Sequence, residues 1–120
     1  MFDSKIEVDA FGKMRKHYYL TQGDSQYIYV YPKNQQGKIV MDNITSCTFK
    51  LAKDEVIDCK YVSVFSSELS REEERFLLEL TAEDTEMLMP ATYRYQFDIA
   101  FVDGSIQTLQ GFFTITPVVV

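Results

Sequence analysis

The residues with the potential for chemistry are few, and they are scattered along the chain. There is one histidine, His17, next to Tyr18 and Tyr19 in a stretch that we expect to be extended. A catalytic base or metal ligand needs partners that converge on it in space, and the sequence suggests none for this imidazole. We therefore expect His17 to be structural or solvent-facing.

The carboxylates do not form a recognisable catalytic set. Glu83 and Asp84 are adjacent in a short predicted turn, where their simplest role is to cap the turn or to be solvated. A glycosidase needs two carboxylates across a cleft, for which a domain of 120 residues has little room. The run Glu72-Glu73-Glu74 lacks the alternating oxygen ligands and the glycine of a calcium loop, so it is expected to be a solvated loop. The sequence thus predicts no catalytic residue, metal site or cofactor, and a protein that is not an enzyme.

The two cysteines, Cys47 and Cys59, are too few for a disulfide framework, and their spacing matches no zinc-binding pattern. Cys47 lies in a predicted strand with Phe49 and Leu51 on the same face. This placement favours a buried free thiol, with a disulfide bridge or a reactive thiol as the alternatives.

Length and charge narrow the class of protein. A chain of 120 residues fits one domain over residues 1–120 and can bury roughly two-thirds of its unfolded surface. The net charge of -6 argues against a nucleic-acid partner, which requires clustered Lys and Arg. No apolar run is long enough to cross a membrane, and residues 1–10 lack the features of a signal peptide, so synthesis in the cytoplasm is expected.

The most informative stretch is residues 85–104. Within it, Tyr93, Tyr95, Phe97 and Ile99 alternate with polar residues, as in a strand that buries one face. The stretch closes on Asp103-Gly104, a strong hairpin signal.

The strand after this turn, over residues 105–116, constrains the loop. Phe113 can share the inner face with Tyr93 only if the loop has an odd number of residues, which favours a loop over 102–104 with Gly104 in the left-handed conformation. Phe112 then faces outward. Gly111, inside the strand, indicates a bulge or a close backbone approach.

The remaining pattern predicts further short strands separated by turns. We expect strands at 17–21, 26–31, 44–52, 60–65 and 75–81, a turn at 53–55, and a short helical turn at 82–86. Ser70 is expected in a solvated loop or as the cap of another helical turn. About seven strands at regular spacing predict an all-β fold, an immunoglobulin-like antiparallel β-sandwich.

One row of tyrosines is a candidate binding surface. Ile28 and Val30 are expected to point inward, which leaves Tyr27, Tyr29 and Tyr31 on the other face. Tyrosine gives contact area at low entropic cost and offers a surface on which a sugar can stack. The alternative is that the row covers the sheet edge or the N-terminal arm.

The two ends of the chain are candidate interfaces. Residues 1–16 are ambiguous: Ile6 and Val8 alternate with Glu7 and Asp9, which permits a short strand. The segment as a whole is either a frayed terminus or an arm that pairs with a neighbouring subunit. At the other end Pro117 stops the strand, and Val118, Val119 and Val120 follow as bare apolar chain close to the outward-facing Phe112. Apolar residues clustered at a sheet edge indicate a partner, so we expect a homo-oligomer or a monomer that docks through these ends.

Two resemblances extend this interpretation. Leu88, Pro90, Thr92 and Tyr93 have the spacing of the corner between strands E and F in immunoglobulin-like and fibronectin type III domains. This resemblance implies that the Tyr93 hydroxyl bonds to backbone a few residues upstream. The Cys…Trp…Cys set of antibody domains is absent, which excludes that type.

A wider resemblance runs from Leu20 to the end of the chain. Its features are Gly23-Asp24, Leu80-Thr81 followed by Glu83-Asp84-Thr85, Tyr93, Asp103-Gly104 and Gly111-Phe112-Phe113. In these the chain resembles the small immunoglobulin-like domains of tailed bacteriophages, most of all the N-terminal domain of the baseplate upper protein family. It departs from that family at Pro90-Ala91-Thr92, where a glycine is usual.

The phage resemblance implies a function without catalysis. It suggests a structural module of the virion tail or baseplate, made in the bacterial host and acting in virion assembly or host attachment. Its partners would be other tail or baseplate proteins. A carbohydrate-binding or other adhesion module, with a surface glycan as ligand, is the alternative.

Overall fold

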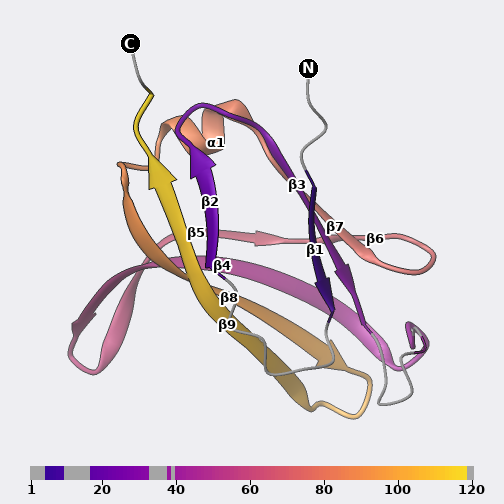
Figure 1. Cartoon of the computed structure of the whole chain (residues 1–120). Coiled ribbons are helices and arrows are strands. Elements are labelled where there is room, and N and C mark those ends of the chain that lie inside the picture. Colours follow the sequence, from indigo (N-terminus) through magenta and orange to yellow (C-terminus); the bar gives the residue numbers. More distant parts are fainter. Residues whose placement is uncertain (1–4, 10–16, 33–37, 39, 119–120) are drawn as a thin grey trace.

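The computed structural model describes residues 5–9, 17–32, 38 and 40–118, with only the backbone described for 5–9 (Figure 1). These residues form nine strands and one short helix. One sheet has four strands, in the order β1 (Lys5–Asp9), β3 (Gln26–Tyr31), β7 (Phe76–Leu80) and β6 (Ser70–Arg71). The other has five, in the order β2 (His17–Thr21), β9 (Ile106–Thr116), β8 (Ala91–Phe101), β4 (Ile44–Ile57) and β5 (Lys60–Glu68).

This arrangement confirms the predicted all-β sandwich and corrects two details. The structure describes nine strands rather than about seven, because residues 5–9 and the two residues of β6 also pair. The sheets are also not purely antiparallel, since β1 runs parallel to β3 and β2 runs parallel to β9. Part of the predicted N-terminal arm is thus a strand of this chain's own sheet, and the rest of it lies outside the described residues.

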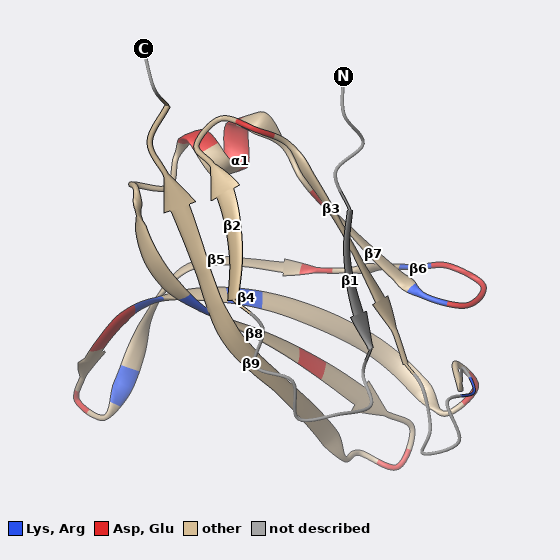
Figure 2. Ribbon diagram, in the orientation of Figure 1, with Lys and Arg blue, Asp and Glu red and all other residues tan. Residues whose placement is uncertain are grey.

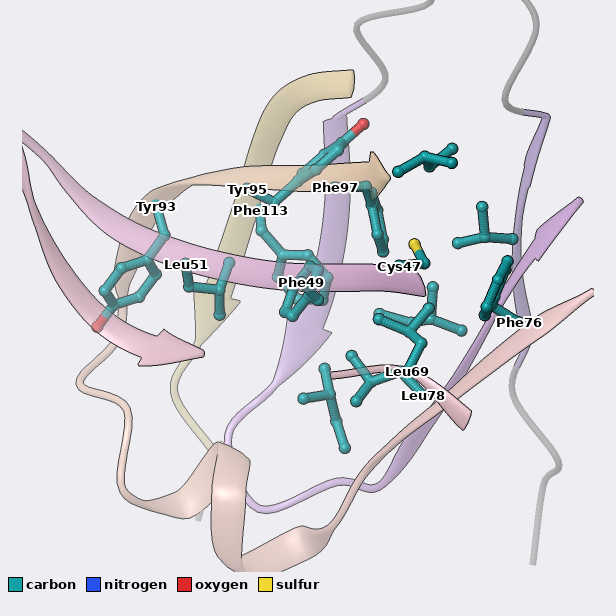
Figure 3. Packing of buried hydrophobic residues seen from close by; sticks show 14 of the residues in the cluster. Cys47, Phe49, Leu51, Leu69, Phe76, Leu78, Tyr93, Tyr95, Phe97 and Phe113 are labelled. Atoms are coloured by element: carbon teal, nitrogen blue, oxygen red, sulfur yellow. The ribbon is translucent and has the colours of Figure 1, made fainter. Parts of the chain in front are cut away.

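The core lies between the inner faces of the two sheets. Phe49, Phe97 and Phe113 are fully buried from the five-stranded sheet, and Phe49 lies 5.0 Å from Phe97 between ring centroids (Figure 3). The four-stranded sheet buries Ile28, Val30, Phe76, Leu78 and Leu80 against them, as the alternation predicted. Removal of this apolar surface from water is the main force that holds the sheets together.

The hairpin of β8 and β9 has the predicted odd loop. Tyr93 pairs with Phe113 and Phe97 with Leu109, while the Phe101 N–H donates to the Ser105 carbonyl at 2.9 Å, which leaves residues 102–104 as the loop. Gly104 has a φ of +90°. The register continues without a shift where Gly111 faces Tyr95, so the bulge considered for Gly111 does not occur in this ladder.

The hairpin of β4 and β5 differs from the prediction. The turn expected at residues 53–55 is wrong, because β4 continues to Ile57 and the chain reverses at Asp58 and Cys59. All residues from 53 to 61 are exposed, so this part of the hairpin projects beyond the core (Figure 1). Lys53, Asp54 and Glu55 are polar because they face water and not because the chain turns there. The partner strand β5 is likewise longer than predicted and ends at Glu68. Ser70 lies in β6, and not in the solvated loop or helical turn that was expected.

A short helix and a tyrosine close one end of the sandwich. Helix α1 (Ala82–Glu86) begins with a capping box, in which Thr81 and Asp84 each accept a bond from the other's backbone N–H. After α1 the chain passes Pro90, which is exposed, and enters β8. There the Tyr93 hydroxyl donates to the Met89 carbonyl at 2.5 Å, the bond that the corner resemblance implies.

The two cysteines are free thiols in different surroundings. Cys47 is buried in the core and Cys59 is exposed at the hairpin tip. Burial raises the pKa of the Cys47 thiol to about 12, with a smaller contribution from the negative charge of Asp98. A reactive thiolate at Cys47 is therefore disfavoured at neutral pH.

Replacing Cys59 by glycine is expected to stabilise the fold. Asp58 and Cys59 have φ values of 51° and 64°, a conformation that costs a non-glycine residue about 1 to 2 kcal/mol. Glycine removes this cost at Cys59 but adds freedom to the unfolded chain worth about 0.4 to 1 kcal/mol. We expect Cys59→Gly to raise the free energy of unfolding by about 0.5 to 1 kcal/mol in urea denaturation. Cys59→Ala is the control, and equal stability of the two variants would contradict the turn geometry.

Removing the Tyr93 hydroxyl should destabilise the protein. Tyr93→Phe keeps the buried ring but leaves the Met89 carbonyl without its donor, for an expected loss of about 1 to 3 kcal/mol. The urea midpoint measures this loss. Tyr61→Phe, which removes an exposed hydroxyl, is the control and should leave the midpoint unchanged.

Thiol titration should distinguish the two cysteines. At pH 8 under non-reducing conditions, a disulfide reagent is expected to label only Cys59 in the native protein, and both thiols in urea. Burial and the raised pKa protect Cys47. Rapid labelling of both thiols in the native state, or of neither in urea, would show that this assignment is wrong.

Candidate functional site

The predicted tyrosine row lies on β3 and is half-buried. The rings of Tyr27 and Tyr29 stack with 6.5 Å between centroids, on the face opposite Ile28 and Val30. The Arg75 guanidinium lies 3.9 Å from the centre of the Tyr29 ring and donates to the Tyr31 hydroxyl at 3.1 Å. One face of Tyr29 is therefore already covered, and a ligand role for this row stays a prediction.

The predicted C-terminal interface is only partly described. Phe112 faces outward but is half-buried, with the Arg94 guanidinium 4.8 Å from its ring centre. Val118 is exposed. Val119 and Val120 lie outside the described residues, so an interface through these four residues also stays a prediction.

The outer face of the five-stranded sheet holds a groove that the sequence analysis did not identify. This open groove has a volume of about 290 Å³. Four neighbouring strands line it, chiefly through Lys50, Lys60, Tyr61, Arg94, Gln96 and Gln110. Lys50, Gln96 and Gln110 form one cross-strand row, while Ala52 lies opposite Arg94 in the next. The small side chain of Ala52 leaves the hollow between longer neighbours.

A hydrogen-bonded network fixes the polar groups along this face. The Asp98 carboxylate accepts bonds from the Gln96 amide at 2.8 Å and the Thr108 hydroxyl at 3.0 Å, and it pairs with Lys50 at 3.3 Å. The Gln110 amide donates to the Gln96 oxygen at 2.9 Å. Because an ionised carboxylate can only accept, Gln96 must turn its NH2 to Asp98 and its oxygen to Gln110. The orientation of both amides is thereby set.

A row of aromatic rings that includes one guanidinium runs beside this network. The Arg94 guanidinium lies 4.8 Å from the ring centres of both Tyr61 and Phe112, and its Nε donates to Asp54 at 2.9 Å. Such cation–π contacts hold the guanidinium in place between the two rings. Two further rings extend the row, since His17 lies 5.9 Å from Phe112 and stacks on Tyr19 at 4.4 Å.

His17 is thus exposed and belongs to a surface row of rings. Its Nε2 also bonds to the Thr114 hydroxyl, which fixes the ring against β9. Within the described part of the chain no group of three or more His, Cys, Asp or Glu side chains is placed to hold a metal ion. The arrangement on this face offers hydrogen-bond donors, acceptors and aromatic rings, which are the components of a binding site.

Acidic residues lie both beside this face and away from it. Figure 2 shows acidic segments on β8 and at the tip of the β4–β5 hairpin, and others farther away at α1 and in the loop between β6 and β7. In that loop Glu72 pairs with Arg75 at 2.6 Å, while Glu73 and Glu74 are exposed.

No helix in the described residues has the length and hydropathy needed to span a bilayer.

Comparisons with known proteins bear on the fold. No family model matches the chain, and no curated protein matches it. Among solved structures it is similar to the N-terminal domain of phage TP901-1 ORF48, with a TM-score of 0.58 and 10% sequence identity. The match covers 94% of this chain and 97% of that one. At this identity the likeness is one of fold: this chain shares, over nearly its whole length, the fold of a phage domain of the kind its sequence resembles.

Proposed function

We propose that this protein is a non-enzymatic structural module of a bacteriophage tail or baseplate, acting in virion assembly or host attachment. The observation that carries the proposal is the extent of the structural likeness. A match over 94% of one chain and 97% of the other pairs whole domains and not a shared fragment. The sequence features from Leu20 onward support the same class independently. In this proposal the protein resides in the virion tail, and its partners are other tail or baseplate proteins.

One end of the sandwich has the character of a docking surface. Lys53 on β4 pairs with Tyr93 near the start of β8, and Ala91 pairs with Ile115 near the end of β9. By this register the tip of the β4–β5 hairpin, the segment before β8 and the segment after β9 all belong to the same end of the sheet, where the hairpin projects away from the other two (Figure 1). This end, which we call the docking end, carries the exposed apolar residues Val56, Ile57, Met87, Met89 and Val118.

The exposure of these side chains is high for apolar groups. Met87 is 85% exposed and Met89 76%, while Val56 and Ile57 are each more than half exposed. Single exposed apolar residues are ordinary, but several at one end of a small domain indicate a partner. We infer that the docking end binds a neighbouring tail or baseplate protein, and that a homo-oligomer forms if a second copy uses the same surface.

The first test is whether the protein is part of a virion. Mass spectrometry of virions purified from the source of this sequence is expected to find the chain in the tail fraction. If virion preparations contain tail proteins but never this chain, the structural role is wrong.

The second test concerns the docking end. Ile57→Ser combined with Met89→Ser should weaken binding to co-expressed tail proteins, or self-association in light scattering, by at least about tenfold. Stability should be unaffected, because both side chains are more than half exposed. Val102→Ser combined with Ile106→Ser is the matched control, since these residues are equally exposed at the opposite end of the β8–β9 hairpin. Equal effects of the two pairs, or a chain that stays monomeric and binds no tail protein, would contradict the proposed surface.

A further inference from the structure

We propose that the groove on the outer face of the five-stranded sheet binds an acidic saccharide, a sugar that carries a carboxylate or a phosphate. The groove residues are different from the apolar residues of the docking end. Sugar binding by the groove can therefore be tested independently of the structural role.

The charge of the groove favours an anion. Its lining includes Lys50, Lys60 and Arg94 and no carboxylate, although the chain as a whole has a net charge of -6. Lys50 and Arg94 each pair with one aspartate at the margin, whereas Lys60 has no ionic partner among the described residues. Counted over the lining residues and these two aspartates, the net charge is +1. The remaining N–H groups of Arg94 have the planar geometry that suits carboxylate or phosphate.

The neutral groups of the groove suit hydroxyls. A sugar hydroxyl both donates and accepts, and the amides of Gln96 and Gln110 offer both functions. The bonds among Asp98, Gln96 and Gln110 hold these amides in place before a ligand arrives. Groups that are already ordered lose less conformational entropy on binding, which favours affinity for a small ligand.

Tyr61 supplies the aromatic surface. It is 43% exposed at the edge of the groove, and the Arg94 guanidinium, 4.8 Å from its ring centre, covers one face and holds the ring in position. The C–H groups on one side of a sugar ring are weakly positive and pack against the negative face of an aromatic ring. Tyr61 and the row of Lys50, Gln96 and Gln110 thus present an apolar and a polar side to the same ligand.

An acidic peptide fits this groove less well. Extended peptides are bound largely through main-chain hydrogen bonds at a free sheet edge. The groove lies on a sheet face, where β4 and β8 are each paired on both sides and their backbone groups are engaged in the ladders. β5 at the margin is an edge strand, but the floor of the groove on β4 and β8 offers side chains alone, with the mixture of amides, cations and a ring that a charged sugar requires.

The test is an NMR titration of the 15N-labelled full chain with separate probes. Trigalacturonate and glucose 6-phosphate supply the carboxylated and the phosphorylated sugar, and the one that binds identifies the acidic group. Maltotriose, inorganic phosphate and a tetraglutamate peptide supply the neutral sugar, the bare anion and the acidic peptide. We expect shifts of the Lys50, Gln96 and Gln110 resonances with at least one acidic sugar, and at least about tenfold weaker binding of the other three probes. No shift with either acidic sugar, or equal binding of any comparison probe, overturns the proposal.

Variants locate the site. Lys60→Glu and Tyr61→Ala should each weaken acidic-sugar binding by about tenfold or more, with the amide spectrum showing that the fold is kept. Lys53→Glu and Ile106→Ala change a lysine and a large exposed side chain at positions that do not line the groove, and they should alter affinity by less than about twofold. If Tyr61→Ala does not fold, Gln110→Ala is used in its place, because Gln110 is an exposed residue of the groove. Equal losses in the groove and control variants would show that the sugar binds elsewhere.

Discussion

The register of β8 between its two neighbours is the constraint on which the rest of the structure depends. β8 pairs along its length with β4 on one side and β9 on the other. Tyr93, Tyr95, Phe97 and Ile99 consequently point into the core, and the alternate positions form the outer face. A slip of one residue would exchange the two faces. The three-residue loop with Gly104 at positive φ prevents this slip, because it fixes which residues of β9 lie opposite which residues of β8.

The sequence predicted well those features that depend on local periodicity. Alternation identified the inner residues of β3, β7, β8 and β9, and the parity of the hairpin determined that Phe113 points inward and Phe112 outward. The capping residues of α1 likewise act within one turn. The end of β4 was missed because Lys53, Asp54 and Glu55 are turn-like in composition, while the residues that do turn, Asp58 and Cys59, adopt left-handed conformations that are unusual for a cysteine. The parallel pairing of β1 with β3 and of β2 with β9 was missed, because local periodicity does not show which strands become neighbours.

The groove could not be found from the sequence for a related reason. Its residues come from β4, β5, β8 and β9, and only the pairing of these strands places Lys50, Gln96 and Gln110 in one row. Each residue by itself is an ordinary polar position on the solvent side of a strand. The hollow at Ala52 depends further on the shifts of register between β4 and β5 beside it. The signal that the sequence does contain is the pair Arg94 and Gln96 on the outer side of the alternation in β8.

The network on this face is better explained by binding than by stability. Half-exposed ion pairs such as Lys50 with Asp98 and Arg94 with Asp54 contribute about 0 to 1 kcal/mol each, because water solvates the separated charges almost as well. A solvated sheet face with unconnected polar residues would lose at most about 1 kcal/mol for each pair. What the connections do provide is order: Asp98 has three donors, the two amides have one orientation, and Arg94 is held between two rings. Fixed polar groups around a hollow are of little use to folding, but they lower the entropy lost when a ligand binds.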